Sequence, residues 1–182
     1  MTTGRTAALL AVAFATLGAG VPNEFAPQPG QAPFGDKIAE QRLPTYHRAT
    51  KVIATSGPIG DRGVIEAKRL GFAAIADLRP AGDDTAAERQ GAEYARIRYV
   101  NIPVDGAPTA EQVKRFADVV ADRGNLPLLL HGANIDQSGA MWALYRASIG
   151  VPPAIAFEDG VTAGLSASGA AVQARLDGTK PQ

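Results

Sequence analysis

The sequence predicts a three-layer α/β/α fold around a central, mainly parallel sheet of four to five strands. Short apolar segments bounded by turn residues, typical of strands, occur at 52–55, 72–78, 97–103 and 125–130. The segment at 72–78 is almost continuously apolar, as expected for a strand covered on both faces. A stretch with helical spacing follows each segment, and this alternation favours right-handed βαβ units.

Start signals place the helices between these strands. Asp61 is expected to cap a helix that runs to residue 70. Thr85 with Glu88, and Thr109 with Gln112, have the capping-box spacing and predict the starts of the next two helices. Further helices are expected at 138–149, 154–163 and 170–176.

The termini differ in composition from the predicted domain at 36–176. Residues 1–20 resemble a secretory signal peptide, because Arg5 precedes an apolar, small-residue stretch at 7–21. An uncleaved N-terminal anchor or a core helix is the alternative. The proline-rich segment 21–35 predicts a linker or arm, and 177–182 a disordered tail. We therefore expect an exported protein, periplasmic or secreted, with no membrane span after signal removal.

Composition excludes several kinds of chemistry. The 182 residues carry 18 Lys and Arg against 18 Asp and Glu, so no net positive field favours nucleic acid as a partner. The chain has no cysteine, which excludes disulfides, zinc–thiolate sites and thiol catalysis. We expect no cofactor and no metal.

The segment 128–147 is the strongest local signal in the chain. It reads as a buried strand, a loop of small residues and the first turns of a helix. Backbone N–H groups and the positive end of the helix dipole converge at such a loop, which makes it a potential anion site. Because functional loops lie at the carboxyl ends of parallel strands, the loops holding Arg79, Asp105 and His131 are expected to share one edge of the sheet.

This segment resembles the bacterial tyrosine-phosphatase-like proteins of the cysteine-phosphatase, dual-specificity type, some of which are associated with β-lactamase-like hydrolases. Members of that family read His-Cys-x-x-Gly-x-Arg before a helix. His131, the run at 139–146, the corner at 77–80 and the loop at 102–105 match the family pattern. The resemblance covers about residues 45–165 and implies the cysteine-phosphatase type of α/β fold.

The positions that would carry the chemistry depart from the family. Gly132 stands at the position of the nucleophilic cysteine, Ile135 at that of the loop glycine and Gln137 at that of the phosphate-binding arginine. A glycine forms no covalent intermediate, and a neutral amide binds phosphate less strongly than a guanidinium. Asp136 adds a carboxylate that either opposes an anion or simply suits the first turn of the helix. The degenerate anion-binding loop comprises His131, Gly132, Ala133, Asn134, Ile135, Asp136, Gln137 and Ser138.

Three further residues have both a functional and a structural interpretation. The resemblance places Asp105 at the general-acid position, although an Asp before Gly is also common in turns. His131 is either a general base or a structural residue whose ring binds backbone carbonyls. Arg79 either lies at the rim and supplies positive charge, or joins two loops as a structural pin.

The sequence thus predicts an exported phosphatase-like domain without the catalytic Cys and Arg: a pseudophosphatase that binds or scaffolds an unknown protein or a small anionic ligand. One alternative is a phosphoric ester hydrolase with cysteine-independent chemistry, in which Asp105 and His131 activate water. Another is a partner-binding protein that uses the proline-rich arm.

Overall fold

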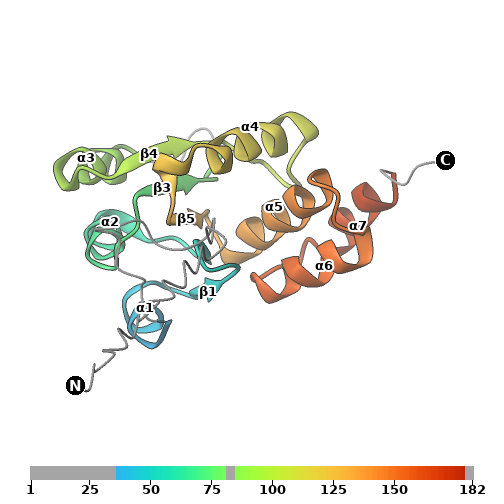
Figure 1. The fold of residues 1–182 in the computed structure, drawn as a ribbon, viewed down its shortest axis with the longest axis horizontal. Helices are drawn as coiled ribbons and strands as arrows, with labels where there is room; N and C mark the ends of the chain where they lie inside the picture. The colour runs from blue at the N-terminus through green and yellow to red at the C-terminus, as the bar shows by residue number, and fades with distance from the viewer. Residues whose placement is uncertain (1–35, 81–84, 179–182) are drawn as a thin grey trace, which may run out of the picture.

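The computed structural model describes residues 36–80 and 85–178. Five strands form one sheet in the order β1-β2-β5-β3-β4 (Figure 1). Their bounds are His47–Arg48 for β1, Ile53–Ser56 for β2, Ala74–Asp77 for β3, Arg98–Asn101 for β4 and Leu128–His131 for β5. Only β1 pairs antiparallel, so the predicted mainly parallel sheet is confirmed.

Helices cover both faces of the sheet. One layer consists of α1 (Asp36–Arg42), α2 (Gly60–Arg69) and α3 (Ala86–Ala95). The other consists of α4 (Ala110–Ala121), α5 (Ile135–Ser148), α6 (Pro153–Thr162) and α7 (Gly169–Gly178), and a 3-10 turn at Arg123–Asn125 precedes β5. In Figure 1, α5 runs between α4 and the α6–α7 pair. The three-layer α/β/α architecture predicted from the sequence is therefore confirmed.

Neighbouring residues of the central strands face opposite layers. Leu128 and Leu130 of β5 pack in the cluster under α4 to α7, whereas Leu129 packs in the cluster under α1 to α3. In β3, Ala74 and Ala76 likewise face one layer and Ile75 the other. Since every side chain of these two strands is buried, the continuous apolar runs in the sequence reflect a sheet without a solvent face.

Several predicted boundaries were wrong. Helix α2 begins at Gly60 with Ile59 at its N-cap, so Asp61 lies inside the helix. Helix α5 begins at Ile135 rather than Ser138, because the side chain of Asn134 caps it by accepting a hydrogen bond from the Gln137 N–H at 2.9 Å. The predicted strand at 125–130 begins only at 128, since residues 123–125 form the 3-10 turn.

The ends of the domain are partly described. Helix α7 continues through Gly178, so two residues of the predicted disordered tail are helical. The predicted signal peptide and the proline-rich arm lie outside the described residues. Among the helices that the structure describes, none is long and apolar enough to cross a bilayer.

Candidate functional site

The carboxyl ends of β3 and β5 bring Asp77 and His131 together. The parallel register places His131 beside Asp77 on one side and beside Ser56 of β2 on the other. The imidazole Nε2 lies 3.7 Å from Asp77 Oδ1. Because residues that end adjacent parallel strands meet at one edge, this proximity follows from the strand order rather than from sequence spacing.

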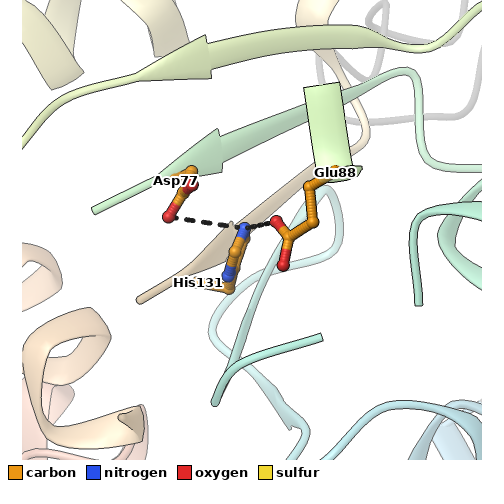
Figure 2. A group of neighbouring side chains, drawn as sticks. All are labelled: Asp77, Glu88 and His131. Carbon is orange, nitrogen blue, oxygen red and sulfur yellow. Dashed lines mark ion pairs between the residues drawn. The ribbon is translucent and has the colours of Figure 1, made fainter. Parts of the chain in front are cut away.

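Glu88 completes this group from the helix layer. It lies in the first turn of α3, and its Oε2 is 3.1 Å from His131 Nε2 (Figure 2). Its other oxygen, Oε1, accepts a hydrogen bond from the backbone N–H of Gly60 at 2.9 Å. Asp77, Glu88 and His131 are all at most 1% exposed, so solvent screens their interactions little.

Arg79 supplies positive charge to the two carboxylates. Its Nη2 lies 2.8 Å from Asp77 Oδ2 and 2.9 Å from Glu88 Oε2. The hydroxyl of Tyr99 also donates a hydrogen bond to Asp77 Oδ2. Burial alone would raise the pKa of Asp77, but the Arg79 hydrogen bonds, the nearby His131 and Tyr99 outweigh burial and hold that pKa below its usual range. Asp77 is therefore ionised at neutral pH.

Asp77, Glu88 and His131 also have the ligand types of a metal centre. One ligand atom from each lies within 4.8 Å of the other two, all buried. The guanidinium of Arg79, however, already contacts both carboxylates that a cation would need. A divalent ion at this position would face a fixed positive charge at close range. The residues therefore suit an internal ion-pair network better than a metal.

The loop between β5 and α5 is filled by its own glutamine. Oε1 of Gln137 accepts a hydrogen bond from the Ala133 N–H at 2.9 Å, and its Nε2 donates to the Val104 carbonyl at 3.3 Å. A Cβ built on Gly132 would lie 2.5 Å from Oε1 and 3.1 Å from Cβ of Gln137. A side chain at position 132 would therefore require the Gln137 side chain to move.

Asp136 turns away from this loop. Its carboxylate accepts hydrogen bonds from the Ser166 N–H at 2.6 Å and from the Ser168 N–H at 3.1 Å, in the segment between α6 and α7. Burial alone would raise the pKa of Asp136. These hydrogen bonds outweigh burial, so the pKa lies below its usual value. The geometry favours the interpretation as a first-turn residue, with an added role in anchoring that segment.

The other predicted site residues differ in their exposure, and the segment that holds Asp105 borders the loop, because the Val104 carbonyl accepts a hydrogen bond from Gln137 at 3.3 Å. Asp105 lies exposed in the segment after β4. Ser138 is fully buried inside α5, and its hydroxyl donates to the Ser56 carbonyl at 3.0 Å. The expectation that the His131 ring binds backbone carbonyls was wrong, because its Nε2 faces the carboxylates of Asp77 and Glu88. Arg79 joins the 77–80 corner to α3 through its contacts with Asp77 and Glu88, which fits the structural interpretation.

Sequence reasoning missed the buried network itself. Glu88 was expected to complete a capping box with Thr85, but Thr85 makes no side-chain cap bond and Glu88 turns inward to His131. The sequence shows Asp77 only as part of the 77–80 corner and carries no signal for Tyr99. The one available signal was Asp77 itself, an acid at the end of an otherwise apolar strand.

The model of the family "DSP-PTPase phosphatase fused to NAD+ Kinase" matches residues 51–167, which is more than half of the chain. The chain belongs to this family. The matched range begins just before β2 and ends after α6, so it contains β2 to β5, the loop at 131–138 and the buried network around His131.

The probable NAD kinase 2, chloroplastic, of Oryza sativa subsp. japonica is 34% identical to this chain over 97 residues. The alignment covers 50% of this chain and 10% of the rice protein, so the chain spans about a tenth of that relative. The similarity therefore concerns one part of a much longer protein.

Solved structures share the fold at low sequence identity. Tk-PTP in the active form is similar with a TM-score of 0.60 and 18% identity, covering 75% of this chain and 99% of Tk-PTP. P. aeruginosa TpbA in complex with pTyr is similar with a TM-score of 0.56 and 21% identity, covering 73% of this chain and 86% of TpbA. Both confirm the phosphatase-like fold predicted from the 128–147 segment.

Proposed function

We propose that this chain is a non-catalytic pseudophosphatase domain that binds or scaffolds a partner. The observation that carries the proposal is the self-filled loop between β5 and α5. The Gln137 side chain occupies the space above Gly132 and accepts the hydrogen bond of the Ala133 N–H. A phosphate held by such a loop needs its amide donors free, and Gln137 already binds the Ala133 N–H.

The chain also lacks the nucleophile, and the Gln137 side chain lies where a side chain at position 132 would be. No cysteine occurs anywhere in the chain, and Gly132 has no side chain to attack phosphorus. Gln137 replaces a charged bidentate donor by a neutral amide that is already bound within the loop. Catalytic groups of this kind act as a unit, so the exposed Asp105 alone supplies little rate.

The cysteine-independent hydrolase gains no support from the geometry. Its general base would be His131, whose side chain is fully buried and lies against two carboxylates. A general base must reach the proton of a bound water or substrate. Asp105, the other member of that scheme, is exposed, whereas His131 is fully buried.

A restoration experiment tests the proposal. The triple variant Gly132→Cys, Ile135→Gly, Gln137→Arg supplies the nucleophile, the loop glycine and the anion-binding fork, and we expect it to turn over p-nitrophenyl phosphate. The matched control carries Gly132→Ser with the same two other changes and is expected to be inactive. Gly132→Cys alone is also expected to be inactive, because Gln137 stays in the loop.

The wild-type protein is expected to show no turnover above the buffer rate. Turnover by the wild type that Asp105→Ala abolishes would overturn the proposal, since it would show that the retained acid still works. Turnover that Asp105→Ala leaves intact and that further purification removes belongs to a contaminant. A triple variant that folds normally yet stays inactive would contradict the part of the proposal that assigns the loss of catalysis to positions 132, 135 and 137.

Export of the protein is part of the same proposal. It rests on Arg5 and the apolar stretch at 7–21, the pattern of a secretory signal. Expression of the full chain in a Gram-negative bacterium, followed by fractionation and mass measurement, tests it. A periplasmic product that begins near residue 21 is expected, whereas an intact cytoplasmic chain would contradict export.

A further inference from the structure

A pocket of about 450 Å³ lies at the end of the sheet opposite the loop between β5 and α5. Its walls come from Val52 and Ile53 at the start of β2, from the end of α4, and from the second half of α5. That loop, by contrast, joins the end of β5 to the start of α5. Helix α5, visible between α4 and α6 in Figure 1, therefore contributes to both places. The pocket volume is in the range of small-molecule sites.

The inner surface of this pocket is apolar and aromatic. Val52, Ile53 and Leu126 line it together with Trp142 and Tyr145. The two rings lie 5.5 Å apart between centroids and are inclined at 39°. Such a surface favours the apolar or aromatic body of a ligand, because burial of that body removes it from water.

Cations surround this apolar surface. Lys51, Arg123 and Arg146 line the pocket, and no acidic residue is among its described lining residues. Arg146 is held by Asp159, whose Oδ2 lies 2.8 Å from its Nε, and its guanidinium carbon is 5.8 Å from the centre of the Trp142 ring. In a chain with no net charge, this local excess of positive charge favours an anionic group.

A buried phenol adds a hydrogen-bond donor. The Tyr145 side chain lines the pocket at 9% exposure, and its hydroxyl has no hydrogen-bond partner within the part of the chain that the structure describes. Burial raises the pKa of Tyr145, against the opposing effect of Arg146, so the hydroxyl keeps its proton at neutral pH. The hydroxyl can therefore donate a hydrogen bond to a ligand in this pocket.

From these observations we propose that the pocket binds a small amphipathic anion, with an aromatic or alkyl body and one carboxylate or phosphate head. The body contacts Trp142 and the apolar wall. The head lies among Lys51, Arg123 and the Tyr145 hydroxyl. This site is separate from the loop at 131–138 and does not depend on any catalytic activity there.

Trp142 makes the proposal measurable, because it is the only tryptophan of the chain and lines the pocket. Its fluorescence is titrated in the full chain with 4-phenylbutyrate, with 4-phenylbutyl phosphate and with the neutral 4-phenylbutyramide. We expect saturable changes with at least one of the two acids, and binding of the amide roughly tenfold weaker or more. The tighter acid identifies the head group.

Variants separate this site from general adsorption. The double variant Lys51→Gln, Arg123→Gln is expected to weaken acid binding about tenfold while leaving the amide unchanged. Lys37→Gln removes an exposed cation of α1 outside the pocket and is the matched control, with no effect expected. Tyr145→Phe is expected to weaken acid binding several-fold, with circular dichroism and thermal melting confirming that each variant folds.

Three outcomes would overturn the proposal. One is the absence of any saturable signal up to ~10 mM acid, because a dissociation constant above that concentration means negligible binding. Another is equal affinity for the acids and the amide, which would indicate an apolar surface without charge recognition. The third is an acid affinity that the Lys51 and Arg123 changes leave at the wild-type value in folded protein.

Discussion

Replacement of Glu88 by alanine tests whether the buried network holds the sheet edge together. Glu88 is 1% exposed and contacts three groups: Arg79 at 2.9 Å, His131 at 3.1 Å and the Gly60 N–H at 2.9 Å. Alanine leaves a largely buried guanidinium, with its side chain 12% exposed, facing one carboxylate instead of two, and it removes the acceptor of a backbone donor. Removing one partner from a buried charge group costs about 3–5 kcal/mol. We expect a loss of that size in the free energy of unfolding.

Urea denaturation of the full chain, followed by circular dichroism, measures this loss. Glu66→Ala is the matched control, because Glu66 pairs with two arginines whose side chains are 52% and 68% exposed. Exposed pairs contribute about 0–1 kcal/mol, so the control is expected to lose no more than that. A loss below about 1 kcal/mol for Glu88→Ala, or one equal to that of Glu66→Ala, would refute the importance of the network.

Two further predictions concern packing and pH. Gly139→Ala is expected to destabilise the protein by about 1–3 kcal/mol in urea denaturation, because its Cβ would lie 2.0 Å from the backbone nitrogen of Leu165. Gly178→Ala, with nothing within 4 Å, is its control and should change stability by less than about 0.5 kcal/mol. Asp136→Asn is expected to lose about 1–2 kcal/mol at neutral pH, since it weakens hydrogen bonds that lower the pKa of the carboxyl in the folded state. A carboxyl with a depressed pKa stabilises the fold above its unfolded pKa of about 3.9 and loses that contribution as the pH falls through the folded pKa. The deficit of Asp136→Asn should therefore be constant above about pH 5 and shrink in acid, and a deficit independent of pH down to acid denaturation would contradict this assignment.

Local signals in the sequence predicted most of the secondary structure. The capping box of Thr109 and Gln112 is present at α4, because both of its hydrogen bonds join residues of one turn. The apolar segments became strands within a few residues of their expected bounds. Signals of this kind succeed where the partners lie close in sequence, since no distant element has to be placed first.

Long-range partners decided the failures. Thr85 and Glu88 have the same spacing as Thr109 and Gln112, yet Glu88 turns inward because His131, 43 positions later, lies within 3.1 Å. Spacing along one helix says nothing about a buried histidine on another element. The charge of Arg79 and the burial of the site override the local preference of a first-turn carboxylate for the helix end.

The sequence by itself determined the α/β class and the absence of cysteine, and its resemblance to a known family led to the proposal that Gly132, Ile135 and Gln137 replace a cysteine, a glycine and an arginine. These features depend on composition, on local periodicity or on a single stretch of residues. Only the tertiary structure decided that Gln137 fills the loop, that Asp136 binds the segment after α6, and that Glu88 belongs to a buried network. Side-chain direction depends on packing between elements, and that packing exists only once the sheet has brought distant residues together.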